Sequence, residues 1–470
     1  MISLEPADKT ISAELIRYIK KENISISSFA DKSGINSGTL SRIINGNQSI
    51  SVSHLDLITR AMNLEEGYFY TLYADECFMQ SSLDWRRLGP FIMRCAELGK
   101  LQCIDQVIGM TMDNLSYSSL LFDSAETLYQ NENKEAALII FKTVAESEKY
   151  QHAERLALCQ YRIFTCSLSQ DQENNLECAV QFESYVSRLS ESEQLDALKD
   201  LTNIFLSLRK WNKARYYAQE MGRISRYLYE QKNYRKKRNG KYIEPKKPLF
   251  GYILYSDLLL GAISAENGDY EQALYYLSCY EDQSWIIETD ELAELTKNQF
   301  REWAIGNGYL YRLMTGNTTI LDEYVEYISS RKDEILRALF KIVQAANYYH
   351  FDIDKYLERF EDLISDQLEL SGTIGSYTVH IMDDRFANFL TDVGLYYLKK
   401  DNIKKGFKYI LESLVISFKI NNTANMVRCC SMIENIRHKL DNSNLQKYAA
   451  IMKEVYNPDE EKISGTLIHH

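Results

Sequence analysis

A polar run near the N-terminus carries side chains whose types and spacing suit hydrogen bonding to DNA bases. Ser37, Thr39 and Ser41 supply hydroxyls that can donate or accept at base edges. Arg42 can bond a guanine through two parallel hydrogen bonds. Together with Gly38, these residues are predicted to point outward from one short helix, so the chemistry that they indicate is base recognition.

Catalytic motifs are not found in the sequence. It contains no Gly-rich phosphate loop, no His-Glu-x-x-His and no nucleophile elbow. Nine cysteines, an odd number, show no Cys-x-x-Cys spacing, and they are expected to be reduced and mostly buried thiols. We therefore expect no enzyme activity, no catalytic residues, no metal site and no cofactor.

Three short helices are predicted to position the polar run. Apolar residues at helical spacing predict the first, and Ser25 is the expected N-cap of the second, which stops at Gly34. Asn36 is the expected N-cap of the third helix, which ends at 45–47 because Asn and Gly tolerate left-handed backbone geometry. Two short helices separated by a turn are typical of a helix-turn-helix, and the third helix would be the one that reads DNA.

A fourth short helix is predicted to complete this module. It is expected to begin at Ser53, with Asp56 three residues later completing a capping box. Its predicted buried residues are Leu55, Ile58, Ala61 and Met62. The alternative interpretation of the module is a four-helix packing unit or a degenerate protein-binding domain.

The run Ser28-Phe-Ala-Asp-Lys-Ser-Gly-Ile-Asn-Ser-Gly-Thr-Leu-Ser-Arg-Ile-Ile-Asn-Gly46 resembles the lambda-repressor-like, Xre-type DNA-binding domain, and the resemblance covers roughly residues 10–66. It implies that the polar run faces DNA, together with Asn36, and that Asn45 and Asn47 lie near phosphates. One departure is Ile26, which stands where many relatives have Gln and cannot hydrogen-bond DNA. The full candidate set for DNA binding is Lys32, Asn36, Ser37, Gly38, Thr39, Ser41, Arg42, Asn45 and Asn47.

The length and composition indicate a large helical body behind this module. The chain has 470 residues and only five prolines, and none of them lies in 91–244 or 249–457, which predicts an almost entirely helical, all-α protein. Residues 1–63 carry seven Lys or Arg against six acids, a sum of +1, so the rest of the chain carries −13 within the net charge of −12. With no run of about 20 apolar residues, we expect no membrane association and a cytoplasmic location.

Small residues twelve positions apart predict degenerate tetratricopeptide-like repeats in the part of the chain that follows the helix-turn-helix. Such repeats need a small residue on each helix of a pair where the two helices cross. The clearest case is Gly261 with Ala273, followed by Leu277, and further cases are Ala125 with Ala137 and Phe141, Thr202 with Ala214 and Ala218, Ser167 with Ala179, and Gly394 with Gly406 and Ile410. The predicted fold is therefore an N-terminal lambda-repressor-like helix-turn-helix followed by a right-handed tetratricopeptide-like α-solenoid.

A solenoid of this kind presents a concave face on which an extended peptide can lie. The 34 tyrosines fit such a groove, because a ring with a hydroxyl can line a surface that is partly apolar and partly hydrated. Asparagine amides can donate and accept along a peptide backbone at the same time. The candidate peptide-binding residues are Asn203, Tyr255, Asn307, Tyr311, Asn347 and Asn388.

The predicted division of the chain has four parts. Residues 1–66 form the helix-turn-helix domain, and 67–90 form a linker with a docking helix. The expected boundary signal in this linker is the run Trp85-Arg-Arg-Leu-Gly-Pro90. The repeat domain covers 91–457, and 458–470 form a tail. Residues 232–248 are expected to be a basic loop that interrupts the repeats and either contacts DNA phosphate or an acidic partner or is simply a solvated insertion.

A helix-turn-helix followed by tetratricopeptide-like helices resembles the RRNPP superfamily of peptide receptors in Gram-positive bacteria and their phages, and in particular its DNA-binding branch of PlcR-like regulators and arbitrium receptors. The resemblance implies a homodimer that binds double-stranded DNA at an inverted repeat. It also implies a short signalling peptide, bound by the repeats, that changes the dimer geometry, as in quorum sensing or the lysis-lysogeny decision. The alternatives are a protein that sequesters a partner such as a response regulator, and a phage or plasmid repressor that senses no ligand.

Overall fold

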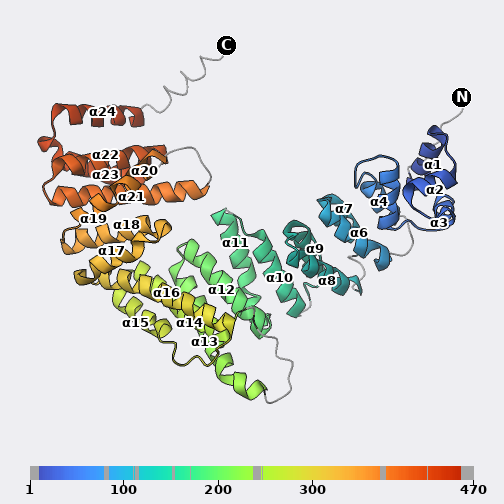
Figure 1. Ribbon diagram of the computed structural model, residues 1–470, viewed down its shortest axis with the longest axis horizontal. Coiled ribbons are helices and arrows are strands. Elements are labelled where there is room, and N and C mark those ends of the chain that lie inside the picture. Colours follow the sequence, from blue (N-terminus) through green and yellow to red (C-terminus); the bar gives the residue numbers. More distant parts are fainter. Residues whose placement is uncertain are drawn as a thin grey trace, which may run out of the picture. The chain divides into compact units, whose positions relative to one another are not determined.

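Every regular element that the structure describes is a helix. The computed structural model describes residues 10–78, 84–109, 111, 116–150, 154–169, 171–236, 245, 247–370, 377–420 and 422–456. These ranges contain 24 α-helices and three short 3-10 helices, which are drawn in Figure 1. The expected all-α class, with a helix-turn-helix followed by helical repeats, is confirmed.

The chain divides into two compact units, and the boundary falls inside α13, after Tyr217. The first unit holds α1 (Ile11–Lys21), α2 (Ile26–Ser33), α3 (Ser37–Ile44), α4 (Val52–Ala61), α5 (Tyr70–Phe78), α6 (Trp85–Glu97), α7 (Leu101–Gly109), α8 (Ser116–Gln130), α9 (Lys134–Ser147), α10 (Glu154–Ser167), α11 (Gln172–Glu183), η1 (Val186–Arg188), α12 (Glu191–Ser207) and the start of α13 (Trp211–Lys236). The second unit holds the rest of α13, α14 (Leu249–Glu266), α15 (Tyr270–Glu281), α16 (Glu291–Met314), η2 (Thr318–Ile320), α17 (Leu321–Ser329), α18 (Lys332–Tyr349), α19 (Asp354–Arg359), α20 (Glu361–Leu370), α21 (Tyr377–Lys399), α22 (Ile403–Lys419), α23 (Thr423–Ile436), η3 (Arg437–Lys439) and α24 (Asn442–Tyr456).

Two expected boundaries are wrong. The fourth helix begins at Val52 rather than at Ser53, because Ser51 is its N-cap and accepts a hydrogen bond from the backbone N–H of His54. The run at 85–90, which was expected to mark a boundary, forms the first half of α6, in which Pro90 is the sixth residue. Proline lacks the N–H that would bond the carbonyl four residues earlier, and the helix tolerates this loss because its apolar face is buried.

Close helix crossings occur where the repeat pattern places small residues. In the pair α21 and α22, a Cβ added to Gly394 would overlap Cγ1 of Ile410 and lie 3.1 Å from the carbonyl oxygen of Gly406. In the pair α14 and α15, a Cβ on Gly261 would lie 3.5 Å from the carbonyl oxygen of Ala273. Backbones approach this closely only where the side chains at the crossing are absent or small. The spacing of twelve residues therefore identified real helix crossings.

The hydrophobic core follows these helix pairs within each unit. In the pair α8 and α9, Ala125, Ala137 and Phe141 are fully buried, as the repeat pattern predicts. One described helix, α14, is long and apolar enough to cross a membrane by length and composition alone, but 72% of it is buried within the protein. It is therefore the central core helix of its neighbourhood, packed against α15 and α16.

The nine cysteines are free thiols, and five of them are buried. Burial raises the pKa of Cys159 to about 12 and that of Cys166 to about 11, so both are protonated at neutral pH. The burial of five of the nine confirms the expectation of mostly buried thiols.

We expect Gly394→Ala to destabilise the protein by about 1–3 kcal/mol, because the new methyl group overpacks the crossing of α21 and α22. The matched control is Gly251→Ala in α14, where the nearest side-chain atom to the added Cβ lies 3.6 Å away. That substitution should be neutral or stabilise by up to about 1 kcal/mol, because Ala is the better helix former. Urea unfolding followed by circular dichroism measures both, and equal midpoints for the two variants would contradict the close crossing.

Candidate nucleic-acid interface

The turn between α2 and α3 is fixed by a glycine and two capping side chains. Ser25 caps α2 by accepting from the backbone N–H of Ser28 at 3.1 Å. Gly34 ends α2 in the left-handed region, with φ of +74°, where a residue with a Cβ would be strained. Asn36 then starts α3, accepting through Oδ1 from the backbone N–H groups of Gly38 and Thr39 at 3.0 and 3.4 Å. The predicted caps and turn of the helix-turn-helix are therefore present.

One side of α3 is buried and the other carries the predicted DNA-contacting residues. Leu40 and Ile43 are buried against the other helices of the module. The nine candidate residues are all at the surface, with Thr39 and Ser41 half-buried and the rest exposed: Lys32, Asn36, Ser37, Gly38, Thr39, Ser41, Arg42, Asn45 and Asn47. Except for Lys32, which lies on α2, these residues lie on α3, at its two caps or just beyond its end.

Weak contacts within the module arrange some of these side chains. The Arg42 guanidinium donates to the Thr39 hydroxyl at 3.4 Å, and the Asn45 amide donates to the Ser41 hydroxyl at 3.4 Å. Both contacts join residues three or four positions apart and are long enough to be exchanged for a contact with DNA. Lys32 differs, because its ammonium group donates to the Tyr18 hydroxyl at 3.1 Å and lies 5.5 Å from the centre of that ring.

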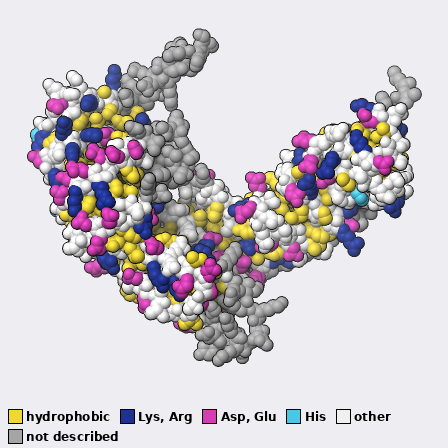
Figure 2. All heavy atoms as spheres, viewed as in Figure 1, with side chains coloured by type: hydrophobic (Ala, Val, Ile, Leu, Met, Phe, Trp, Pro, Cys, Tyr) yellow, Lys and Arg dark blue, Asp and Glu magenta, His cyan; other side chains and the backbone are white. Residues whose placement is uncertain are grey.

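The electrostatics of the module suit a contact limited to α3 and its flanks. Figure 2 shows Lys and Arg side chains interspersed with Asp and Glu over the face in view, without a broad basic surface. Ile26, at the start of α2, is 38% exposed and offers only an apolar contact. Because residues 1–63 carry seven Lys or Arg against six acids, binding would come from short-range hydrogen bonds and a few charges on α3 and its flanks rather than from a wide positive field.

A half-buried contact joins the module to the helices that follow it, and sequence reasoning anticipated only its location. The Asp56 carboxylate, on α4, accepts from the Tyr70 hydroxyl of α5 at 2.8 Å and from Nε of Arg94 on α6 at 3.1 Å. Arg94 also pairs with Glu66 and Glu97. Burial and the neighbouring Asp56 raise the pKa of Tyr70, and hydrogen bonds to Glu97 and Asp56 raise that of Arg94, so both stay protonated.

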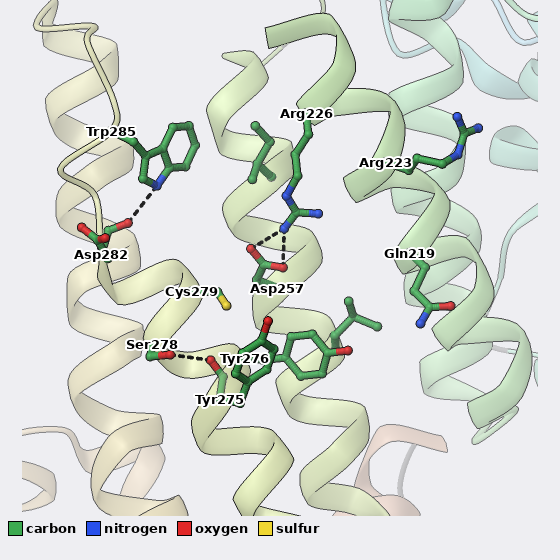
Figure 3. A pocket seen from close by; sticks show the side chains of 12 residues that line it. Gln219, Arg223, Arg226, Asp257, Tyr275, Tyr276, Ser278, Cys279, Asp282 and Trp285 are labelled. Atoms are coloured by element: carbon green, nitrogen blue, oxygen red, sulfur yellow. Dashed lines mark hydrogen bonds and ion pairs between the residues drawn. The ribbon is translucent and has the colours of Figure 1, made fainter. Parts of the chain in front are cut away.

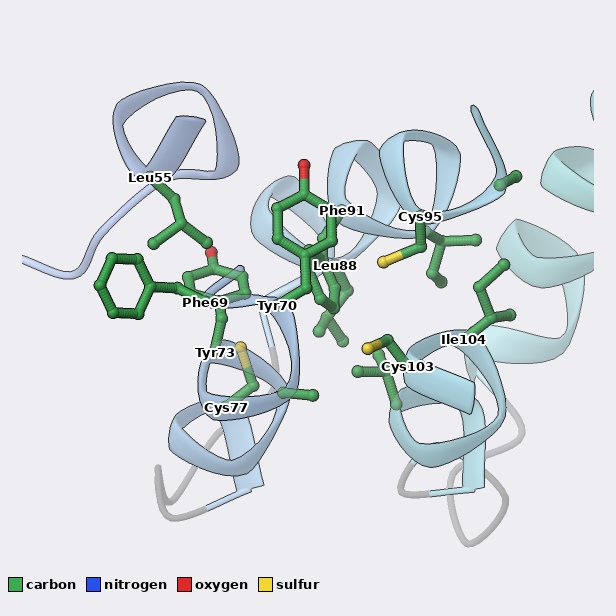
Figure 4. Close-up of a cluster of buried hydrophobic side chains, with 14 of the residues drawn as sticks. Leu55, Phe69, Tyr70, Tyr73, Cys77, Leu88, Phe91, Cys95, Cys103 and Ile104 are labelled. Atoms are coloured by element: carbon green, nitrogen blue, oxygen red, sulfur yellow. The ribbon is translucent and has the colours of Figure 1, made fainter. Parts of the chain in front are cut away.

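Aromatic side chains form the apolar part of this contact (Figure 4). The Phe91 ring lies 5.2 Å from the ring of Tyr70 and 4.8 Å from that of Tyr73. The Tyr73 hydroxyl donates to the carbonyl of Ile50 at 2.7 Å, just before α4. Sequence reasoning expected a docking helix within 67–90, whereas the shared role of Asp56 had no signal because its spacing from Ser53 suggested a cap.

A comparison with protein-family models supports the assignment of this module. Residues 15–69 match the helix-turn-helix family. No curated protein matches the chain. The geometry and the match together identify the N-terminal module as a DNA-binding helix-turn-helix of the Xre type, the kind of domain found in transcriptional regulators rather than in enzymes. Among the described residues, no group of three or more His, Cys, Asp or Glu is placed to hold a metal ion.

The candidate peptide-binding residues are distributed over five helices. Asn203 lies on α12 in the first unit, and the other five lie in the second, on α14, α16, α18 and α21. Tyr255 is half-buried on α14, and the amide of Asn307 donates to the Tyr280 hydroxyl at 3.1 Å. The amide of Asn388 donates to a carbonyl one turn earlier in its own helix.

Two of the six candidates are packing residues in this structure. Tyr311 is 2% exposed and belongs to the core around α14, α15 and α16. Asn347 is 8% exposed, and its amide donates to the carbonyl of Asp392 at 2.8 Å, joining α18 to α21. Its Oδ1 is buried without a partner among the described residues. Neither side chain lies open to a ligand here, so their peptide-binding role stays a prediction.

The start of the expected basic loop at 232 is wrong, because α13 continues as helix to Lys236. The side chains of 232–244 lie outside the described residues, as do the predicted tail at 458–470 and both terminal histidines. Pro248 is at the N-cap position of α14, where proline is well tolerated.

We expect Arg94→Met to weaken the docking of the module by about 1 kcal/mol, because Asp56 would keep only the Tyr70 hydroxyl as a partner. Hydrogen exchange of the amides in α4, α5 and α6 should speed up in this variant. Arg17→Met, which removes the exposed ion pair with Glu14, is the control and should leave those rates unchanged. Unchanged rates in both variants would show that Arg94 does not hold the contact together.

Proposed function

We propose that this protein is a peptide-responsive transcriptional regulator that binds DNA as a homodimer. The observation that carries the proposal is the exposed polar face of α3, capped by Asn36 and preceded by the Gly34 turn, in a module that matches the helix-turn-helix family. A reading helix of this width enters the major groove with its N-terminal residues at base edges. On this proposal Arg42 is the main reader, with Ser37, Thr39 and Ser41 beside it.

The homodimer follows from the geometry of the operator. A single short reading helix contacts only a few base pairs, and two copies related by a two-fold axis reach half-sites about 34 Å apart, or one DNA turn. An inverted repeat then contains one copy of the site for each protomer. Docking of the module through Asp56 and Arg94 ties α4 to α5 and α6, so on this proposal the spacing between two reading helices depends on the helices that follow the module.

The regulatory part of the proposal is that a short signalling peptide binds the helical repeats. Close crossings at Gly261 and Gly394 support this, because helix pairs of this kind stack into surfaces that hold extended peptides. A peptide can change operator binding only if its affinity differs between the conformations that do and do not fit the operator. Its site must therefore involve helices that move between those two conformations.

We expect selection from a random duplex library with the full chain to enrich an inverted repeat. The selection should run at moderate salt, so that non-specific phosphate binding is suppressed. A single half-site would contradict the dimer, and no enrichment in either the presence or the absence of culture-derived peptides would contradict DNA reading.

The enriched duplex then tests the peptide. A synthetic or culture-derived peptide that changes duplex affinity at least fivefold would support the regulatory part. An operator that binds with the same affinity in every peptide fraction would instead indicate a repressor that senses no ligand.

A further inference from the structure

The second unit contains a hollow of about 800 Å³ that the proposed function does not use. Its walls are α13, α14 and α15, with Trp285 at one end (Figure 3). Known small-molecule sites have volumes of about 300–1,000 Å³, so the hollow is large enough for a ligand of ordinary size. All of the residues that line it belong to the second unit.

The α13 wall carries a row of hydrogen-bond donors. Gln219, Arg223 and Arg226 line the hollow and are spaced four and three residues apart, which places them on one face of the helix. Seven residues of helix extend over about 10 Å, so the row spans the length of a small organic molecule. Arg223 is already engaged with Glu220, one turn earlier, which makes Arg226 the stronger candidate for a ligand contact.

Arg226 is held in a fixed orientation by groups beneath it. Its Nη2 donates to both oxygens of Asp257 at 2.6 and 2.7 Å, and the Asp257 side chain is only 6% exposed. Gly222 makes this possible, because a Cβ there would lie 2.7 Å from Nη1 of Arg226 and would overlap the hydroxyl of Ser256. The pair engages Nη2, so the guanidinium keeps Nε and Nη1 for other acceptors while its side chain is 45% exposed.

The other walls supply apolar and aromatic surface together with the polar side chains of Ser278 and Asp282. Ile253 and Leu260 line the hollow from α14, on either side of Asp257, and Tyr276 lines it from α15. Trp285 is fixed by two contacts, because its indole N–H donates to the carbonyl of Asp282 at 2.9 Å and its ring meets that of Tyr229 edge-on at 5.3 Å. An anchored guanidinium beside apolar walls suits a ligand with one anionic group and an apolar body.

This hollow is distinct from the predicted peptide face. Ile253, Asp257 and Leu260 recur at helical spacing and define the side of α14 that faces α13. Tyr255 is two residues from both Ile253 and Asp257, about 200° around the helix, and so it lies on the opposite side of α14. A ligand in the hollow would therefore not contact Tyr255 from that face.

We propose that this hollow binds an organic carboxylate with an aromatic or branched apolar body. The carboxylate pairs with Arg226 by accepting from a guanidinium nitrogen that Asp257 does not engage, and the apolar body lies against Ile253, Leu260 and Trp285. Asp257 is a positioning residue, because it orients Arg226 and does not itself contact the ligand. The carboxylate can come from a free small acid or from the C-terminus of a peptide, which present the same chemistry to Arg226.

The test uses the full chain and N-acetyl-L-phenylalanine as the probe, with its amide as the uncharged match. Titration calorimetry and the fluorescence of Trp285 should show saturable binding of the acid and at least tenfold weaker binding of the amide. A third arm uses Ala-Ala-Phe with a free C-terminus, and tighter binding of that peptide than of the small acid would identify a peptide end as the source.

Arg226→Gln/Asp257→Asn is the decisive variant, because the neutral pair can still hydrogen-bond and leaves no buried charge alone. It should bind the acid at least tenfold more weakly while keeping its circular dichroism spectrum. The control is Arg301→Gln on α16, where Arg301 is exposed and donates to Asn298 outside the hollow. It should bind like the unchanged chain.

Three results would overturn the proposal. Equal binding of the acid and the amide would show that Arg226 recognises no carboxylate, and competition by inorganic phosphate at equal concentration would indicate a general anion site. No saturable binding of either the acid or the peptide would show that the hollow takes no carboxylate. None of these results bears on the helix-turn-helix, because duplex selection is measured without any of these probes.

Discussion

The contact of Asp56 with Tyr70 and Arg94 is the constraint on which the rest of this structure depends. It ties three helices, α4, α5 and α6, to one carboxylate that is largely removed from solvent. Together with the hydrogen bond from Tyr73 to the Ile50 carbonyl, it ties the reading module to the helices that follow it. The packing of Tyr70 and Tyr73 on Phe91 adds the apolar burial that keeps the contact closed.

Local rules predicted the reading module well because its geometry is set by neighbouring residues. The caps Ser25 and Asn36 act within three residues of themselves, and the left-handed turn at Gly34 needs only the absence of a Cβ. The same rules failed at Ser53, because Ser51 offered an equally good cap two residues earlier and the helix began there. They also failed at Pro90, where tertiary burial of α6 outweighed one missing hydrogen bond.

Repeats were predictable where the backbone itself makes the contact. A crossing such as that of Gly394 and Gly406 excludes larger residues, and so it requires small residues at a fixed spacing in the sequence. Side-chain roles leave no comparable mark. Asparagine suits a peptide backbone and an interhelical carbonyl equally well, and only the structure places Asn347 against Asp392. The pair of Arg226 and Asp257 lies 31 residues apart and had no signal at all.

Protection of guanine N7 from methylation, on the operator bound by the full chain, tests the central claim most directly. If α3 lies in the major groove with Arg42 on guanine, one guanine in each half-site should be protected, and both protections should disappear in Arg42→Ala while the fold and the residual backbone contacts remain. Arg17→Ala should keep both protections. Protection that persists without Arg42, or that is confined to adenine N3 in the minor groove, would contradict the assignment of α3 as the reading helix.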